Sequence, residues 1–583
     1  MIPPHLKKYV VEQDYSRYTP VDQAVWRYIL RQLRDFLSEH AHPCYLDGLA
    51  KTGISVERIP VIAEMSDKLE KFGWRAVPVS GFIPPSAFME LQSLGFLPIA
   101  CGMRTLDHLL YTPAPDIVHE AAGHAPILVD PAFAAYLKKY AQVARMALTA
   151  RPDVDYYDAI RALSDAKEDP DSTPAVIDAT ERRLREAGGR ISFVSEAARL
   201  GRMNWWTAEY GLIGGLDKPR IFGAGLLSSV GEARSCLDPV VKKIPLTLEC
   251  VDVGYDITER QPQLFVTPDF ERLVDVLEEL AKTMAFRLGG RPAVEQAIRS
   301  ATVSTVRLDS GLQVSGIIKT CLSSDLAACG SDVAYLQFDG PSQLSFGSEE
   351  IFGHGRAGHP QGFGSPVGWL EGATKSLSDF SEHELRELGV EMGSVARLQF
   401  RSGVVVEGRV IGWTRAPSGA LAIISFRECW AHRGGDKVLF RPEWGTFDMA
   451  VGARVESVFG GPGDRERYGE PDGPAARTFV PRAPDSPDGL RKQALYSEIR
   501  ASRESASIDS DAAASRLLSL LLRTKAELPD AWLPRLELIE AAERLPVRPP
   551  WAEGARDELR ALGAGRREIE GCIADGLRLA APP

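Results

Sequence analysis

Apolar residues recur at helical spacing through most of residues 1–300. Along residues 21–37 (VDQAVWRYILRQLRDFL), five of them fall near one helical face: Val25, Tyr28, Ile29, Leu33 and Leu37. Thr19 and Pro20 precede this stretch, an order typical of a helix start. The segments DPAFAAYLKKYAQVARMAL and DFERLVDVLEELAKTMAFRL repeat the pattern, whereas residues 153–180 are more acidic and less periodic. We therefore predict a mainly α-helical first domain over residues 1–300.

The pattern changes after about residue 301. The segments VSTVRLDSGLQVSGIIKT and VARLQFRSGVVVEGRVIGW are short, β-branched and interrupted by glycine, as strands are. They also resemble each other, because Ser310, Gly311, Val314 and Gly316 recur as Ser402, Gly403, Val406 and Gly408. AYLQF (334–338) and AIISF (422–426) extend the match. We predict a β-rich domain over 301–459 with an internal repeat, built as two small barrels or a sandwich. Chance similarity between two glycine-rich hairpins remains the alternative.

The remaining residues divide into a linker and a helical end. Residues 460–489 are rich in Pro, Gly and charge, which is typical of a linker. From residue 490 onward, DAAASRLLSLLLRTKAEL and AWLPRLELIEAAERL show amphipathic helical spacing. A chain of 583 residues exceeds what one hydrophobic core usually serves. The sequence therefore predicts a multidomain protein with a helical region over 490–583.

Composition excludes several classes of protein. The net charge of −11 argues against nucleic-acid binding through bulk charge. No apolar run approaches the roughly 18–20 residues that cross a bilayer, and the N-terminus lacks a signal-peptide core. The eight cysteines are scattered without a CxxC pair, which favours reduced thiols over a disulfide framework. We expect a cytoplasmic protein without nucleic-acid or membrane partners.

The segment YTPAPDIVHEAAGHAP (111–126) is the richest in candidate metal-binding or catalytic residues. His119-Glu120 suggests the HExxH zinc-protease signature, but His124 lies five residues on instead of four. Five residues leave a net rotation of about 140° on a regular α-helix. The two imidazoles converge only if the helix ends or distorts there, and Gly123 and Pro126 favour that. A zinc protease is therefore disfavoured, while a purely structural histidine pair remains open.

A carboxylate elsewhere in the chain favours a metal site over a purely structural histidine pair. NWWTAEYGLIGG (204–215) places Glu209 inside an aromatic and apolar run, where a lone carboxylate is costly to bury without a cation. Two imidazoles and one carboxylate can bind one face of a metal ion and leave its other positions open. This facial triad is the ligand set of oxygen-activating Fe(II) enzymes.

Residues 15–288 resemble a known family, the pterin-dependent aromatic amino acid hydroxylases. The resemblance rests on seven motifs in the family's order: YTPVDQAVW, ERIPVIAEMSDKL, GWRAVPVSGFIPPSAF, YTPAPDIVHEAAGHAP, WWTAEYGL, GAGLLSSVGE and YDITERQPQLFV. It implies that residues 1–300 have the catalytic fold of that family. It also implies that the iron ligands are His119, His124 and Glu209.

The same resemblance implies further roles around the substrate. Arg104 matches the arginine that pairs with the substrate carboxylate, and a guanidinium fork suits that task. Thr112 and Ser228 match residues near the amino acid end of the substrate. Ser228 and Glu232 could also orient a ligand imidazole. Asp116 is expected to be a structural hydrogen-bond acceptor.

The pterin is expected beside residues 81–88. In that alignment Phe88 stacks on the pterin ring, Phe82 and Ile83 supply backbone contacts, and Glu120 faces the pterin. This chain departs from the family at two positions. Pro98 stands where many relatives have a histidine, and Asn204 replaces a common tyrosine beside the iron. These departures affect details of pterin contact.

The resemblance implies a monooxygenase that uses ferrous iron, O2 and tetrahydrobiopterin or another reduced pterin. One oxygen atom enters the substrate ring and the other leaves on the pterin. Trp205 and Ile257 match positions that line the ring pocket. Their size and apolar character favour L-phenylalanine as substrate and L-tyrosine as product, over tyrosine or tryptophan hydroxylation. A scaffold protein that keeps an inactive hydroxylase fold is the competing class.

The residues after 288 carry no assigned chemistry. We expect the catalytic part to stand alone and the C-terminal half to add assembly or control, with a homo-oligomer left open. His354 and His359, in GHGRAGHP, are spaced for a metal. A glycine-rich surface loop is the favoured interpretation.

Overall fold

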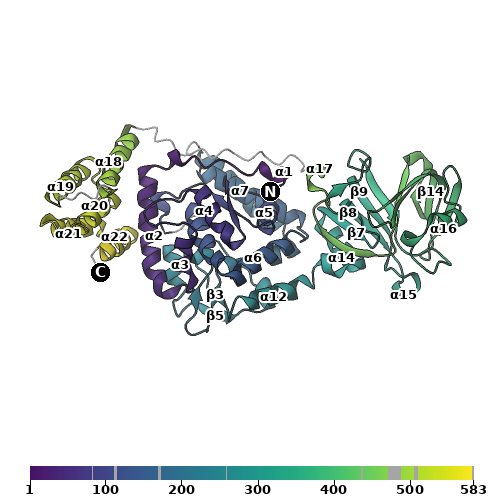
Figure 1. The fold of residues 1–583 in the computed structure, drawn as a ribbon, viewed down its shortest axis with the longest axis horizontal. Coiled ribbons are helices and arrows are strands. Elements are labelled where there is room, and N and C mark those ends of the chain that lie inside the picture. Colours follow the sequence, from purple (N-terminus) through teal and green to yellow (C-terminus); the bar gives the residue numbers. More distant parts are fainter. Residues whose placement is uncertain are drawn as a thin grey trace. The chain divides into compact units, whose positions relative to one another are not determined.

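The computed structural model describes residues 1–583 except 82, 111–114, 169–171, 258, 435–436, 470–486, 505–509 and 581–583. The chain forms two compact units that alternate along the sequence (Figure 1). The site unit comprises Lys8–Lys139, Met203–Val274 and Ala475–Pro583. The sheet unit comprises Met1–Lys7, Tyr140–Arg202 and Asp275–Pro474. This grouping does not follow the boundaries at 300, 459 and 489, which stay a prediction.

The site unit is mainly helical, as the sequence predicted for this part. Its longest helix is α2 (Pro20–His40), which begins at a capping box formed by Thr19 and Asp22. The predicted start at Thr19 and Pro20 is therefore confirmed. Around α2 lie α3 (Cys44–Lys51), α4 (Ile62–Leu69) and α5 (Pro85–Ser93). Strands β1 (Arg75–Val79) and β2 (Phe96–Ala100) pair in parallel, and α5 packs on β2.

The site unit also contains a small sheet and further helices. The sheet has the order β4-β3-β6-β5, with bounds Leu212–Ile213 (β3), Arg220–Ile221 (β4), Lys242–Pro245 (β5) and Gln263–Thr267 (β6). Helices α10 (Ala224–Leu227) and α11 (Val230–Ser235) follow β4. Helix α6 (Pro131–Ala144) continues into the sheet unit, and α12 (Glu271–Ala281) also spans the boundary.

Five C-terminal helices confirm the predicted helical end of the chain. They are α18 (Pro487–Glu504), α19 (Ser510–Glu527), α20 (Leu533–Glu543), α21 (Trp551–Gly563) and α22 (Arg567–Ala580). Helices α18, α20 and α22 contact α2, and Figure 1 shows them beside it. Buried ion pairs join α2 to α20: Arg27 with Glu537 at 2.6 Å, and Arg31 with Glu540. A third pair, Arg503 with Glu540 at 3.0 Å, joins α18 to α20.

Two sheets of the sheet unit confirm that the sequence becomes strand-rich after residue 301. The first has the order β10-β9-β8-β7-β17 with β11 on β9. Its bounds are Val303–Leu308 (β7), Leu312–Ser323 (β8), Val333–Phe346 (β9), Glu349–Glu350 (β10), Gly362–Pro366 (β11) and Val455–Gly460 (β17). The second has the order β12-β13-β14-β15 with β16 on β14. Its bounds are Val395–Gln399 (β12), Val404–Arg415 (β13), Leu421–Arg433 (β14), Lys437–Phe440 (β15) and Phe447–Ala450 (β16).

Helices α13 (Ala285–Leu288) and α14 (Gly290–Ser300) share a hydrophobic core with the strands of the first sheet, and a second core lies around the second sheet. Helices α7 (Arg151–Glu168), α8 (Pro174–Gly189) and α9 (Glu196–Asn204) precede them in the chain. Leu148 and α14 residues Ala293, Val294 and Ala297 are buried in the same cluster as Val306 and Val458. Among the helices that the structure describes, none has the length and apolarity needed to cross a membrane.

Candidate metal centre

Two π-helical turns carry the predicted metal ligands. The first, η4 (Val118–His124), has its hydrogen bonds between residues five apart. This places His119 and His124 on the same face, so the predicted distortion is a π-turn and not a helix end. Gly123 permits the packing, since a Cβ there would lie 2.6 Å from the carbonyl oxygen of Ala224 at the start of α10.

Glu209 ends the second π-helix, η6 (Trp205–Glu209), and meets both histidines. Nε2 of His119 lies 3.3 Å from Nε2 of His124, and each nitrogen lies 3.3 Å from one oxygen of Glu209. Two donor atoms bound to one ion at ~2.1 Å, at an angle of about 90–110°, are about 3.0–3.4 Å apart. The spacing therefore fits three ligands on one face of a metal ion.

Glu120 is a second carboxylate near the histidines but fits the third ligand position less well. Its Oε2 lies 4.0 Å from Nε2 of His124 and has no hydrogen-bond partner among the described residues. Glu209 instead reaches both imidazoles at 3.3 Å. Burial is the main reason that the pKa of Glu120 is raised to about 8; His124 lowers it, whereas Glu209 and Asp116 raise it. Glu120 is thus buried beside the cluster, with one carboxylate oxygen that accepts no hydrogen bond from any described residue.

Ser228 determines which nitrogen of His119 carries the proton. Its hydroxyl donates to the carbonyl of Ala224 at 2.7 Å, and a serine hydroxyl has only one proton. Its oxygen therefore accepts from Nδ1 of His119, at 3.1 Å. This arrangement leaves the lone pair of Nε2 directed toward His124 and Glu209, as a metal ligand requires.

Arg104 is held by Asp116 in a buried two-pronged pair. Nε and Nη2 of Arg104 lie 2.7 and 2.8 Å from the two oxygens of Asp116, and Nη1 donates to the carbonyl of Ser228 at 3.2 Å. Asp116 also accepts from the backbone N–H of His119 at 3.0 Å. Burial alone would raise the pKa of Asp116, but Arg104 and these N–H groups lower it. The pair connects Arg104 to the backbone of a metal ligand.

The electrostatics of Glu209 also fit a ligand role. Burial alone would raise the pKa of this carboxyl, but the imidazoles of His124 and His119 hold it below its ordinary range. Asn204, the residue that departs from the family pattern, donates its side-chain amide to Oε1 of Glu209 at 3.3 Å. Glu209 is therefore ionised and held in one orientation at neutral pH.

Trp205 lies beside the ligands within an aromatic stack. Its ring stacks on Tyr210 at 4.4 Å and on Tyr255 at 4.3 Å between centroids. Tyr255 was not singled out from the sequence, although it lies in the motif YDITERQPQLFV that suggested the family. Ile257, two residues further on, is 41% exposed and so does not lie in a closed pocket.

The other predicted site residues have varied positions. Ile83 is buried just before α5, and Phe88 is half-buried on α5. Helix α5 packs on β2, which contacts η4, and Pro98 is a buried residue of β2. Glu232 lies in the first turn of α11, with a pKa raised by burial and lowered by Arg260. Phe82 and Thr112 lie outside the described residues.

Comparison with known proteins identifies the family. A sequence model of the biopterin-dependent aromatic amino acid hydroxylases matches residues 8–150 and 192–294. A phenylalanine-4-hydroxylase from Mesorhizobium japonicum is 30% identical over 274 residues, covering 46% of this chain and 83% of the relative. The chain belongs to the biopterin-dependent aromatic amino acid hydroxylase family. The resemblance found in the sequence is confirmed.

Further relatives match the same part of this hydroxylase. A phenylalanine-4-hydroxylase from Pseudomonas aeruginosa is 29% identical over 283 residues, covering 48% of this chain and 91% of the relative. A solved structure of the Chromobacterium violaceum phenylalanine hydroxylase has 24% identity and a TM-score of 0.38, covering 48% of this chain and 92% of that one. The family match omits residues 151–191, where α7 and α8 lie, and all residues after 294.

Proposed function

We propose that this hydroxylase is an iron- and tetrahydrobiopterin-dependent phenylalanine 4-monooxygenase that converts L-phenylalanine to L-tyrosine. The observation that carries the proposal is the convergence of His119, His124 and Glu209, with donor atoms 3.3 Å apart on two π-turns. The relatives from M. japonicum and P. aeruginosa are both phenylalanine-4-hydroxylases. Bound Fe(II) and reduced pterin would supply O2 activation, with one atom entering the ring and the other leaving on the pterin.

In this proposal Arg104 binds the substrate carboxylate. Three of the five N–H groups of a guanidinium are used, two by Asp116 and one by the carbonyl of Ser228. The two N–H groups that remain, one on each Nη atom, can donate to a carboxylate in parallel. Asp116 orients the guanidinium, so Arg104 loses little side-chain freedom when it binds substrate. Thr112 would contact the amino acid end of the same substrate.

The pterin would lie on the side of the ligands where Glu120 is buried. A polar ring with N–H donors would satisfy Oε2 of Glu120, which has no hydrogen-bond partner among the described residues. Phe88 would stack on the pterin, and Phe82 and Ile83 would supply backbone contacts. The route from α5 through β2 to η4 connects these residues to the metal ligands.

Trp205 and Ile257 favour phenylalanine over tryptophan and tyrosine. Stacking on Tyr210 and Tyr255 holds the Trp205 ring in place, so it cannot turn aside for the larger indole. The apolar side chain of Ile257 offers no hydrogen bond to a tyrosine hydroxyl, so it gives no preference for tyrosine.

We also propose that the two sheets are copies of one β unit. Gly311 and Gly403 both turn with φ near +80° (88° and 79°) between paired strands. The register of β8 on β9 shifts around Gly316, and that of β13 on β14 shifts around Gly408. Bulges at matching positions, in strands that also match in sequence, support duplication over chance.

A substrate panel tests the function. Purified full-length protein with Fe(II) and tetrahydrobiopterin would be assayed separately with phenylalanine, tyrosine and tryptophan. We expect tyrosine to form from phenylalanine, with kcat/KM at least about tenfold above that for tryptophan, roughly 1.4 kcal/mol. Faster hydroxylation of tryptophan or tyrosine would overturn the substrate assignment. No pterin-dependent hydroxylation of any of them would favour the scaffold alternative.

A further inference from the structure

A second histidine and carboxylate cluster lies in the sheet unit, outside the region that matches the family. It consists of His354, His359 and Asp448. Nδ1 of His354 lies 3.2 Å from Nε2 of His359, and Oδ2 of Asp448 lies 3.8 Å from the first nitrogen and 3.9 Å from the second. The three side chains are 16%, 10% and 13% exposed. The segment around His354 and His359 is a loop with exposed residues, such as Phe352, but its two histidine side chains are mostly covered.

The three donor atoms are spaced for one metal ion. The point equidistant from them lies about 2.1 Å from each, which matches the Zn–N and Zn–O distances of protein sites. The two rings are nearly coplanar, with centroids 5.4 Å apart and planes at 21°. Their nitrogens therefore meet almost head-on, in a direct hydrogen bond. Each ring would turn by about 40° to direct its lone pair at the central point, and the nitrogen that donates the hydrogen bond would lose its proton.

The loop that holds the two histidines is closely packed against the first sheet. The carbonyl of His354 accepts from the N–H of Leu344, and that of His359 accepts from Ser342, both on β9. Glycine is required at position 358, because a Cβ there would lie 2.4 Å from the backbone oxygen of Gly353. The backbone therefore holds both histidines on the same side.

Asp448 comes from the other sheet. It lies on β16, which pairs with β14, and its Oδ1 accepts from the hydroxyl of Ser425 on β14. This bond leaves Oδ2 facing the two histidines. An ion held by all three side chains would therefore connect the first sheet to the second, close to where β11 contacts β16.

We propose that His354, His359 and Asp448 bind a divalent transition-metal ion, with Zn²⁺ as the best fit, which joins the two sheets. Two imidazoles and a carboxylate are common zinc ligands, and a water molecule would complete a tetrahedral site once Oδ2 of Asp448 moves about 0.5 Å closer to the two nitrogens. The residual exposure of the side chains gives that water a place. The site is separate from the iron ligands and does not depend on the proposed hydroxylase function.

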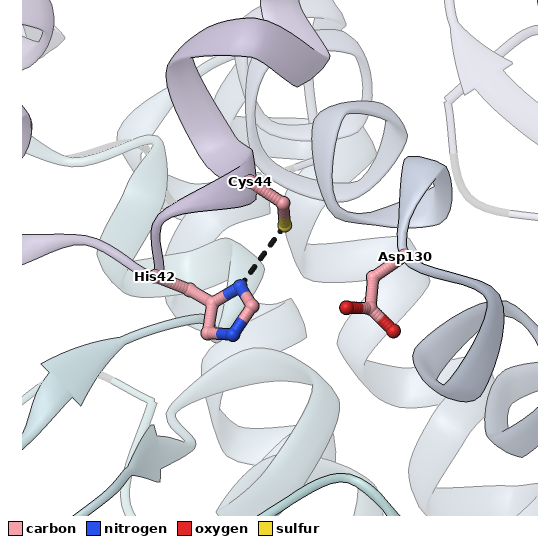
Figure 2. Close-up of side chains that lie close together, drawn as sticks. All are labelled: His42, Cys44 and Asp130. Atoms are coloured by element: carbon pink, nitrogen blue, oxygen red, sulfur yellow. Dashed lines mark hydrogen bonds between the residues drawn. The ribbon is translucent and has the colours of Figure 1, made fainter.

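A third cluster, His42, Cys44 and Asp130, does not meet the same criteria (Figure 2). Nδ1 of His42 lies 3.0 Å from Sγ of Cys44, closer than two ligands of one zinc ion lie. Asp130 caps the start of α6, where its Oδ1 accepts from the N–H of Ala132. Burial, then Asp130, raises the pKa of the Cys44 thiol to about 12, so the thiolate that binds metals is disfavoured. We assign this cluster a structural role.

Metal titration of the full-length protein tests the proposal. Protein stripped with a chelator would be titrated with Zn²⁺ and with Co²⁺, whose visible absorption reports coordination. We expect the wild type to bind two ions per chain, and His354→Gln and Asp448→Asn to bind one. Both variants should keep iron binding and any pterin-dependent turnover. His383→Gln is the matched control, because His383 is 75% exposed in the same unit.

A variant that restores a metal ligand distinguishes loss of the metal site from misfolding of the protein. His354→Cys should recover the second Co²⁺ ion and add a thiolate-to-cobalt absorption band. Adding a chelator should lower the Tm of the wild type by more than that of His354→Gln, which has only the ion at His119, His124 and Glu209 to lose. The proposal is overturned if His354→Gln and Asp448→Asn bind as many ions as the wild type. It is equally overturned if the wild type binds one ion per chain and loses it through Glu209→Gln.

Discussion

Ser228 connects Arg104, the proposed substrate anchor, to His119, a proposed metal ligand. Its hydroxyl oxygen accepts from Nδ1 of His119, and its carbonyl accepts from Arg104. One small residue therefore sets the proton position on an imidazole and the direction of a guanidinium. The sequence indicated that Ser228 belonged near the site, but the proton count that defines its role required the contact with Ala224.

Ser228→Ala should weaken iron binding while leaving the fold intact. Without the serine oxygen, Nδ1–H of His119 has no acceptor there and the ring is free to turn. Loss of such a supporting bond typically costs about 10–100-fold in metal affinity or activity. The measurement is the iron dissociation constant together with kcat. Ser38→Ala, at an exposed serine of α2, is the control. Unchanged iron affinity in Ser228→Ala would contradict this role.

Arg104→Lys should raise the KM for phenylalanine by about 30-fold, roughly 2 kcal/mol, and leave the pterin KM unchanged. Lysine keeps the charge that the buried Asp116 needs, but it loses the fork that binds a carboxylate through two bonds. Arg104→Ala is a poorer test, because it would leave Asp116 buried without its cation. Arg75→Lys, which alters an exposed pair with Glu70, serves as the control. A rise confined to the pterin KM would assign Arg104 to the cofactor.

Among the secondary-structure elements, the π-turn that holds the two histidines was only partly predictable from the sequence. The spacing of His119 and His124 excluded a regular helix with both rings on one face, so a distortion was predictable. Its form was not, because Gly123 and Pro126 fit a helix end as well as a π-turn. The contact that decides is the close approach of Ala224 to Gly123, about 100 residues apart in sequence.

The docking of the C-terminal helices on α2 could not be predicted either. The amphipathic periodicity of residues 490–583 predicted a helical region and identified two of its helices, α19 and α20. The helix that they contact could not be predicted, because the contact uses buried charged residues. Arg27 and Arg31 lie among apolar positions of α2, and Glu537 and Glu540 lie within α20. Periodicity assigns charged residues to the solvent, so it does not reveal buried ion pairs.

Glu537→Gln should destabilise the site unit by about 3–5 kcal/mol, because it leaves Arg27 buried without its carboxylate. Glu537 is 3% exposed and lies 2.6 Å from Arg27. The measurement is the urea-induced unfolding transition followed by circular dichroism. Glu527→Gln, which removes an exposed partner of Arg523, should change stability by less than about 1 kcal/mol. Equal effects of the two variants would show that the buried pair does not stabilise the docking.

In the whole molecule, residues from before and after position 300 share one hydrophobic cluster of the sheet unit, which argues against a domain boundary there. Leu148 and three residues of α14 are buried in one cluster with the strands β7 and β17. The N–H of Gly460 donates to the carbonyl of Met146, and the hydroxyl of Thr302 donates to that of Thr149. The change in sequence pattern at residue 301 marks where strands begin, not where a core ends.

A chain of residues 1–300 should therefore aggregate, because it exposes the apolar residues that the strands cover. The full-length chain keeps both the sheet core and the helices that pack on α2, and it should be monodisperse and bind iron. Size-exclusion chromatography and iron content measure both outcomes. A monodisperse 1–300 chain that binds iron would restore the simpler picture of a catalytic domain that stands alone.

We propose that His119, His124 and Glu209 hold the iron used in pterin-dependent hydroxylation. The direct test measures bound iron and tyrosine formation on the same samples of wild type, Glu209→Gln and His383→Gln, across a titration with Fe(II). We predict about one iron at this site and matching activity in wild type and His383→Gln, with both lost in Glu209→Gln. Tyrosine formation at the wild-type rate by Glu209→Gln would contradict the account.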